Sequence, residues 1–364
     1  MKFYMPVTVY DEPGCVAAHA GEWAGLGTKA LIVTGRSSAV KNGSLSDVKK
    51  ALESQGRQYC VFSDVEENPS VETVVLAAEY GLSEKADFVV GIGGGSPMDA
   101  AKAIAFLMDR DTPSAGSLYD GAVPTTYLPV ICVPTTCGTG SEVTGVSVLT
   151  RHDKRTKGSI PHRIYPEYAL IDGKYLNAAP DSVIVNTAVD ALAHLVESYF
   201  GVKADDYSRY IALAGLDMWK SVKGVLTGDE EITDDARARL MRASALAGMT
   251  IAQTGTALPH ALGYIITYDT GLAHGPACGL FLAGFLKEAD AEEREKVLRA
   301  AGFWEMSDFE AFLTKVLPAC EVPKETALRT FNAVLTAPAK MNSCCFPADE
   351  ALLKRLMASA GLEV

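Results

Sequence analysis

ADFVVGIGGGSPMDAAKAIAFLM, residues 86–108, is the stretch that decides the fold of this chain. Residues 86–92 are apolar except for Asp87 and predict a buried strand, whereas residues 100–108 have the composition of a buried helix. The glycines at 93–95 let the backbone between them approach a bulky anion, because no Cβ stands in the way. Ser96 is suited to be the N-cap of the helix, whose free N–H groups and positive dipole end can receive a pyrophosphate.

Strands and helices alternate on both sides of this stretch. Strands are predicted over 29–34, 58–63 and 129–134, and a helix over 71–83. This alternation predicts a mainly parallel sheet covered by helices.

The second half of the chain has only helical spacing. The helical pattern starts at residue 181, and residues 235–254 are rich in alanine and contain no proline. We therefore expect an α/β domain over 1–178, followed by an all-helical domain over 179–364.

A second glycine-containing turn, PTTCGTGSEVT at 134–144, follows the strand at 129–134. Its small hydroxyl residues can donate to ligand oxygens, and both turns follow strands at the end of the sheet where α/β proteins bind ligands. Residues 91–96 lack the third glycine of the standard dinucleotide fingerprint, and no P-loop lysine follows. From the residues alone, a well-capped strand-to-helix turn and a flexible polar loop remain alternatives to phosphate binding.

Composition excludes several classes of protein. The 364 residues include 45 Asp and Glu against 33 Lys and Arg, a formal charge of −12, which argues against nucleic-acid binding. The longest apolar stretch, residues 275–286, is too short to span a bilayer, and acidic residues follow the N-terminus too closely for a signal sequence. The eight cysteines include no Cys-x-x-Cys pair, so we expect reduced thiols in a cytoplasmic protein without membrane contact.

Three histidines and one aspartate suggest a metal site. Asp190 and His194 are four residues apart on a predicted helix and share one face, although such a pair alone is more often structural. His260 lies in an apolar stretch, and His274 lies in a glycine-flanked turn. Three imidazoles and one carboxylate suit Fe(II), Zn(II) or Mn(II), while Cys278 is assigned to the core.

Four motifs together resemble the iron-containing, or group III, alcohol dehydrogenases. They are GGGSPMDAAK (93–102), PTTCGTGSEVT (134–144), DALAH (190–194) and HALGYIITYDTGLAHG (260–275). The resemblance covers essentially the whole chain. It implies a dehydroquinate synthase-like architecture, with an α/β dinucleotide-binding domain, a helical metal-binding domain, and an active site in the cleft between them.

The resemblance also implies residue roles. The metal ligands, which act in catalysis through the metal, would be Asp190, His194, His260 and His274. The pyrophosphate region would be held by Gly94, Gly95, Ser96 and Asp99, and the rest of the cofactor would be contacted by Thr135, Thr136, Thr144 and Lys157.

Three positions depart from the family pattern. Tyr264 stands where many members carry a second histidine, so a proton relay there is in doubt, and Cys137 replaces a more usual alanine. Gly35 replaces an aspartate that is typical of NAD-using members. Arg36, Ser37 and Ser38 follow, and their donors predict a preference for NADP(H), with NAD as the alternative.

The expected activity is hydride transfer between a small alcohol or aldehyde and the nicotinamide ring. Fe²⁺ is the expected metal, with Zn²⁺ or Mn²⁺ as alternatives, and it would polarise the substrate oxygen while the cofactor carries the hydride. The rival functions are polyol oxidation of the glycerol dehydrogenase type, a dehydroquinate synthase-like lyase, and a non-catalytic sensor. We also expect a homodimer.

Overall fold

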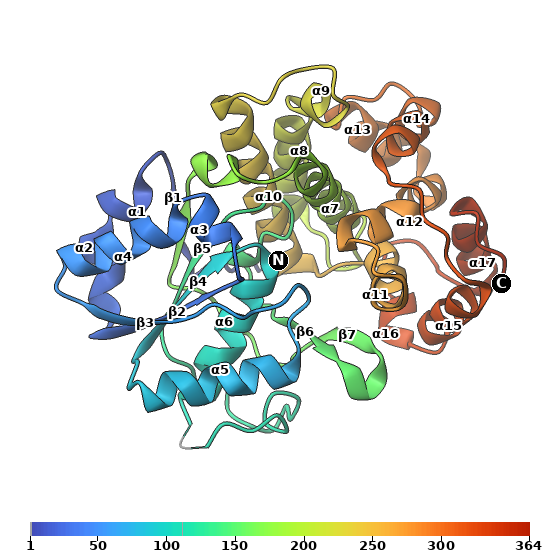
Figure 1. Cartoon of the computed structure of the whole chain (residues 1–364). Coiled ribbons are helices and arrows are strands. Elements are labelled where there is room, and N and C mark those ends of the chain that lie inside the picture. The colour runs from blue at the N-terminus through green and yellow to red at the C-terminus, as the bar shows by residue number, and fades with distance from the viewer. Residues whose placement is uncertain (1, 111) are drawn as a thin grey trace. The chain divides into compact units, whose positions relative to one another are not determined.

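A six-stranded, wholly parallel sheet forms the centre of residues Met5–Pro180 (Figure 1). The computed structural model describes residues 2–110 and 112–364. The strand order is β1-β8-β5-β4-β2-β3. The strands are β1 (Thr8–Asp11), β2 (Lys29–Thr34), β3 (Gln58–Phe62), β4 (Phe88–Gly93), β5 (Val130–Pro134) and β8 (Tyr168–Ile171), and an antiparallel hairpin is formed by β6 (Val148–Arg151) and β7 (Thr156–Ser159).

Helices cover both faces of the sheet. Leu31 and Val33 of β2 pack with the helices on one face, and Ala30 and Ile32 pack with those on the other, because successive side chains of a strand point in opposite directions. The first face carries α5 (Val71–Ser83) and α6 (Gly95–Met108), and the second carries α1 (Cys15–Ala18), α2 (Ala20–Trp23) and α4 (Ser44–Ser54). The remaining short helices are α3 (Ser38–Lys41) and the 3₁₀ turns Ala24–Leu26, Ser141–Val143, His152–Lys154 and Gly173–Leu176.

The predicted strands and helices of this unit are confirmed. β2 and α5 have the predicted bounds, and β3, β4 and β5 differ from prediction by one or two residues at an end. β1, β8 and the β6–β7 hairpin were not predicted. Each is only four residues long, too short for a periodic pattern to stand out.

The predicted N-cap of α6 is wrong. The helix begins at Gly95, its N-cap is Gly94 in extended conformation, and no side chain caps it. Ser96 is already inside the first turn, and its Oγ accepts a hydrogen bond from the backbone N–H of Asn68 at 3.0 Å. The first N–H groups of α6 are therefore not capped by a side chain, which leaves them open to a ligand.

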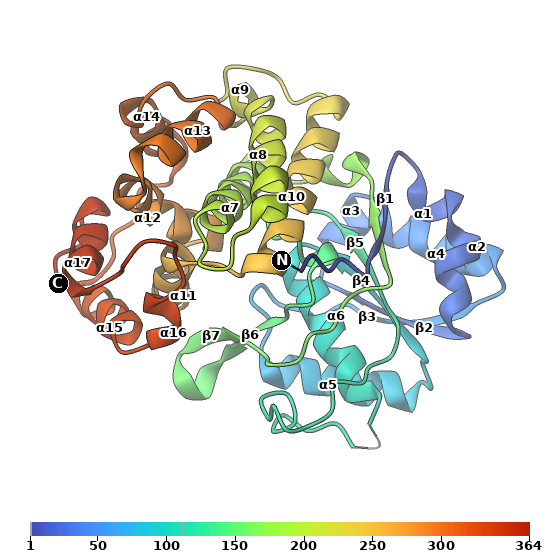
Figure 2. The same ribbon diagram turned by 180° about the vertical axis from the view of Figure 1, so that it is seen from behind.

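The second unit is all-helical, as predicted (Figure 2). Its long central helix α7 (Asp181–Tyr199) packs against α8, α10 and α12, and Trp219 Nε1 donates to the carbonyl of Ala188. The other helices are α8 (Asp206–Lys220), α9 (Lys223–Leu226), α10 (Asp234–Thr254), α11 (Leu258–Thr270), α12 (His274–Glu288), α13 (Ala291–Ala300), α14 (Met306–Val316), α15 (Lys324–Leu335), α16 (Pro338–Met341) and α17 (Glu350–Ser359).

The boundary between the two units falls between Pro180 and Asp181, whereas the sequence placed it after residue 178. The described residues 2–4 also belong to the helical unit. There the backbone N–H of Tyr4 donates to Gln253 Oε1, and Gln253 Nε2 donates back to the carbonyl of Tyr4.

None of the described helices combines the length and the apolar character needed to cross a membrane. The eight cysteines all lie among the described residues and form no disulfide bond, and six of them are buried.

Candidate metal centre and cofactor turns

Three helices of the second unit bring the predicted metal ligands together. Asp190 of α7, His260 of α11, and His274 and Cys278 of α12 each offer a ligand atom, and these atoms lie within 4.8 Å of one another. The ring of His194 stacks on His260, with 4.3 Å between the ring centroids. Three of the four predicted ligands thus lie in one group with Cys278, and the fourth, His194, lies beside it.

The cluster contains polar atoms that the protein does not satisfy. Asp190 Oδ1 and His260 Nε2 are buried 3.4 Å apart, and neither has a hydrogen-bond partner in the described chain. Burial alone would raise the pKa of the Asp190 carboxyl, but the neighbouring histidines, His194 foremost, outweigh burial and hold the pKa well below its usual value. A buried carboxylate and several imidazoles gathered around atoms that have no partner suit a divalent cation, so these residues fit the metal that the sequence implies.

Two glycines permit this convergence of helices. A Cβ on Gly275 would lie 2.0 Å from the carbonyl oxygen of Asn186 and 3.0 Å from Asp190 Cβ, so only glycine lets the start of α12 approach α7. A Cβ on Gly263 would lie 3.0 Å from Cys278 Sγ, where α11 approaches α12. The ligand cluster thus depends on backbone contacts that no larger residue allows.

Cys278, which the sequence assigned to the core, is buried but faces the cluster. Its Sγ lies 3.9 Å from both ring nitrogens of His274. Burial raises the pKa of the Cys278 thiol to about 11, so it is a neutral thiol at physiological pH.

Tyr264 occupies the place of the family's second histidine. Its ring is parallel to that of His274, at 5.2 Å between centroids, and Lys340 Nζ lies 5.7 Å from the Tyr264 centroid. Burial raises the pKa of Tyr264 to about 12. The phenol therefore keeps its proton at neutral pH and is no substitute for a histidine base.

Glu197 is a buried carboxylate of the cluster that the sequence analysis missed. Its Oε1 lies 2.5 Å from Nδ1 of His260. The signal was present in the sequence, since Asp190, His194 and Glu197 have the i, i+4, i+7 spacing of one helix face.

The two predicted cofactor turns lie side by side in the first unit. Gly93 ends β4 directly beside Pro134, which ends β5. A Cβ on Gly94 would lie 3.0 Å from Thr136 Oγ1, and one on Gly95 would lie 2.7 Å from Thr139 Cγ2. The glycines therefore serve the packing of one turn on the other, a role that the sequence did not reveal.

Buried polar contacts tie these turns together. Asp99 Oδ1 accepts from Ser141 Oγ at 2.5 Å, and its Oδ2 accepts from the backbone N–H of Val148 at 2.8 Å. Lys102 is fully buried, and its Nζ donates to Ser141 Oγ at 2.6 Å and contacts Thr144 Oγ1 at 3.4 Å. Asp99 thus has partners within the turns, and Lys102 is a structural residue that the sequence analysis did not select.

Two further predicted cofactor residues, Thr135 and Lys157, form hydrogen bonds near these turns. The backbone N–H of Thr135 donates to the carbonyl of Gly93, and Lys157 Nζ donates to Asn68 Oδ1 at 2.6 Å. Asn68 also donates its backbone N–H to Ser96, so Lys157 is connected to the first turn of α6.

Gly35 directly follows β2, and Ser37 and Ser38 lie at the start of α3. Arg36 is exposed, and its Nε lies 3.3 Å from Asp64 Oδ1, an ion pair that the sequence did not predict.

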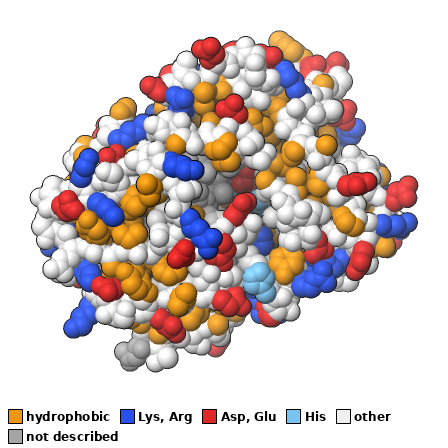
Figure 3. Space-filling model, viewed as in Figure 1, with side chains coloured by type: hydrophobic (Ala, Val, Ile, Leu, Met, Phe, Trp, Pro, Cys, Tyr) orange, Lys and Arg blue, Asp and Glu red, His pale blue; other side chains and the backbone are white. Residues whose placement is uncertain are grey.

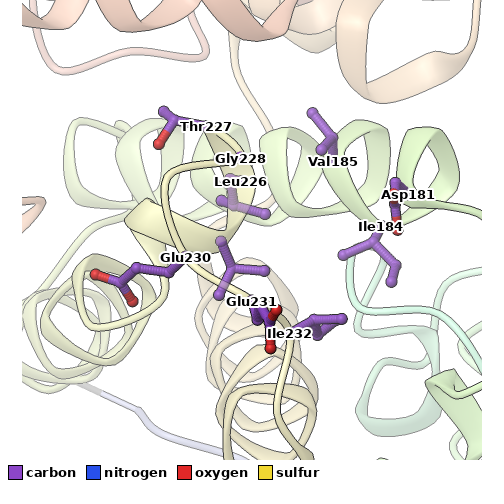
Figure 4. Close-up of a pocket in the computed structure, with 10 residues that line it drawn as sticks. Asp181, Ile184, Val185, Leu226, Thr227, Gly228, Glu230, Glu231 and Ile232 are labelled. Atoms are coloured by element: carbon purple, nitrogen blue, oxygen red, sulfur yellow. The ribbon is translucent and has the colours of Figure 1, made fainter.

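An open pocket elsewhere in the helical unit contains none of the predicted site residues (Figure 4). It lies at the start of α7, between Asp181, Ile184 and Val185 and the segment 225–232. Acidic and basic side chains are interspersed over the face drawn in Figure 3, so this face has no large patch of a single charge.

Comparison with known proteins identifies the family. The profile described as iron-containing alcohol dehydrogenase matches residues 6–173, and that of the C-terminal domain of the same family matches residues 184–342. The chain is similar to long-chain-alcohol dehydrogenase 1 of Geobacillus thermodenitrificans, with 32% identity over 76% of this chain and 71% of that protein. It is 27% identical to an NADPH-dependent butanol dehydrogenase of Clostridium saccharobutylicum, over 83% of this chain and 77% of that protein.

A crystal structure of an iron-containing alcohol dehydrogenase from Thermotoga maritima superposes with a TM-score of 0.91. The two chains are 35% identical, and the match covers 99% of each. The protein belongs to the iron-containing alcohol dehydrogenase family. It is an NAD(P)-linked alcohol dehydrogenase or aldehyde reductase, and membership in this family implies a divalent metal.

Proposed function

We propose that this enzyme interconverts small primary alcohols and aldehydes, with Fe²⁺ as its metal and NADP(H) as its preferred cofactor. The observation that carries the metal assignment is the pair of buried, unsatisfied atoms Asp190 Oδ1 and His260 Nε2. Asp190, His194, His260 and His274 are the proposed ligands. A bound divalent ion would supply a Lewis acid that polarises the alcohol or carbonyl oxygen.

The protein's own residues contribute position and electrostatics. The uncapped N–H groups at the start of α6, next to Gly94 and Gly95, can bind the cofactor pyrophosphate. Asp99 and Lys102 hold the two turns in register through Ser141. Tyr264 stays protonated beside the cluster, so the reaction has to proceed without a base at that position.

The preference for NADP(H) is supported by the residues after β2. Gly35 leaves no carboxylate beside the adenosine ribose, and Ser37 and Ser38 offer hydroxyl donors. Arg36 adds a guanidinium, although Asp64 competes with a 2′-phosphate for it. The NADPH-dependent butanol dehydrogenase of Clostridium is a relative with the proposed cofactor.

The test is an assay of the purified protein loaded with Fe²⁺ or Zn²⁺. We expect loss of NADPH absorbance with small aldehydes, and formation of NADPH from NADP⁺ with the corresponding alcohols. Faster oxidation of glycerol than of monoalcohols would favour the polyol alternative. No turnover with any alcohol or aldehyde, in a protein that holds metal, would refute the proposal. Light scattering would test the expected homodimer.

A further inference from the structure

Glu197 is the residue of the cluster whose role is not yet explained. It lies on α7 with no exposed surface, and both of its carboxylate oxygens are in use. Oε1 lies 2.5 Å from Nδ1 of His260, and Oε2 accepts from the backbone N–H of Ala257 at 2.6 Å. In the described chain, no lysine or arginine forms an ion pair with it. Such a buried anion is costly unless its partners favour the charged form.

One partner is the start of α11. Ala257 is the N-cap of this helix and has no side chain that can cap it. Glu197 Oε2 takes over that function from α7, because it accepts from Ala257 and lies 3.4 Å from the backbone nitrogen of His260. A negative charge at a helix N-terminus is stabilised by the helix dipole.

The other partner is the His260 ring, and this contact fixes the position of its proton. A carboxylate only accepts hydrogen bonds, so Nδ1 of His260 must carry the hydrogen. In the neutral ring, Nε2 is then unprotonated, and Nε2 is the atom that is buried without a partner 3.4 Å from Asp190 Oδ1. Only an unprotonated nitrogen can bind a metal ion.

We infer that Glu197 is a positioning residue for the metal centre, which holds His260 in the Nδ1-protonated form and fixes its ring through the backbone of α11. This inference rests on the proposed metal site. Hydrogen-bond partners of this kind orient metal-bound histidines, and their loss typically weakens metal binding about 10- to 100-fold.

The rival explanation is that Glu197 only caps α11. The Glu197→Gln variant separates the two roles, because glutamine has one acceptor oxygen where glutamate has two. If the amide oxygen accepts from the backbone N–H of Ala257, the amide NH₂ faces Nδ1 of His260. Because the NH₂ group only donates, Nδ1 must then be unprotonated and Nε2 carries the hydrogen. If the amide oxygen accepts from Nδ1 of His260 instead, α11 loses its cap. The protein then loses stability, but the His260 ring keeps its orientation and its tautomer.

The experiment measures two quantities for wild type and Glu197→Gln. Zinc affinity is measured by competition with a chromophoric chelator, and the melting temperature is measured on metal-free protein. We expect the zinc dissociation constant of Glu197→Gln to rise about 10- to 100-fold. Glu197→Leu removes both acceptor oxygens and decides the case in which the glutamine oxygen stays on the ring. Unchanged zinc affinity in Glu197→Leu, with a lowered melting temperature, would overturn the inference in favour of a simple cap.

Asp205→Asn is the matched control. Asp205 is another carboxylate of this unit that caps a helix, since it accepts from the backbone N–H of Ser208 at 3.0 Å. We expect this variant to lose stability but to keep wild-type zinc affinity. His274→Ala distinguishes a wrong metal site from a wrong role for Glu197. If His274→Ala also keeps its zinc, the metal site itself is wrong; if it loses zinc while Glu197→Leu does not, only the role of Glu197 is wrong.

A measurement on the wild type keeps the inference testable if Glu197→Gln does not fold. Nitrogen-15 NMR of histidine-labelled protein at saturating zinc reports which nitrogen of each bound ring carries the hydrogen, and His260→Ala assigns the signal. We expect the Nδ1-protonated form for His260. The Nε2-protonated form would overturn the inference.

Discussion

The metal cluster and the glycine turn at residues 93–95 present binding groups to a ligand in opposite ways. In the cluster, side chains are aimed inward and two of their atoms, on Asp190 and His260, have no partner. In the turn at residues 93–95, backbone N–H groups without a side-chain cap are available, and the polar groups of Asp99 and Lys102 are already bonded within the protein. The cluster should therefore depend on its ligand for stability, whereas the turn should be formed before the cofactor arrives.

The largest expected effect follows from removing a metal ligand. His194→Ala and His274→Ala should stay folded but lose most bound metal and nearly all turnover, and adding metal should no longer raise the melting temperature as it does in wild type. Elemental analysis and thermal unfolding with and without Zn²⁺ check this. Full metal content in both variants would show that the ligand assignment is wrong. For His260→Ala we expect the same direction.

The next effect concerns the turn. Gly95→Val should raise the cofactor KM steeply, because the new side chain meets Thr139 and the space kept for pyrophosphate. Gly25→Val is the control, since a Cβ there has open space around it. Isothermal titration with NADP⁺ gives the affinity of each variant.

A double variant separates the two reasons for glycine at 95. Gly95→Ala combined with Thr139→Ser removes the methyl group that lies 2.7 Å from the new Cβ. If the double variant recovers stability but not cofactor affinity, the space is needed for the pyrophosphate. If it recovers both, the glycine serves only the packing of the two turns.

The second turn also contains a buried carboxyl group, that of Glu142. Burial raises the pKa of its carboxyl to about 7. The folded state therefore binds more protons than the unfolded state between about pH 4.5 and pH 7, and stability should fall as pH rises through this window. Glu142→Gln should remove this dependence and stabilise the protein at pH 8 by about 2–3 kcal/mol.

Urea unfolding at pH 5 and pH 8 tests this prediction, with the exposed Glu79→Gln as control. A Glu142→Gln variant that is no more stable than wild type at pH 8 would contradict it.

The smallest expected effect is on cofactor choice. Gly35→Asp should shift the ratio of kcat/KM values from NADP(H) toward NAD(H) by about tenfold, the lower end for a charge-assisted contact, because Arg36 is exposed and shared with Asp64. Asp64→Asn should shift the ratio the other way, by freeing Arg36. Steady-state kinetics with both cofactors measure this. A wild-type preference for NAD(H), or equal efficiency, would refute the NADP(H) proposal.

Long, regular elements were predictable from the sequence, and tertiary pairings were not. The apolar run of β2, the helical pattern of α5 and the alanine-rich, proline-free composition of α10 predicted their limits almost to the residue. β1 and β8 pair with each other although more than 150 residues separate them, and a four-residue pattern does not predict so distant a partner strand. Ser96 looked like an N-cap because composition cannot show that the backbone starts to coil at Gly95.

The candidate site shows the same division. The identities of Asp190, His194, His260 and His274 could be read from motifs, whereas the way they are supported could not. Glu197 and Lys102 act through partners that are 63 and 39 residues distant, which only the folded chain brings near.

The close approach at Gly275 has a consequence for engineering. Any substitution there places an atom 2.0 Å from the Asn186 carbonyl, so libraries that aim to change substrate range should hold this codon fixed. Tyr264 lies beside the same histidine but fills its space with a side chain, which makes it a suitable position to randomise. One neighbour of His274 is thus closed to mutation by the backbone, while the other is available for laboratory evolution.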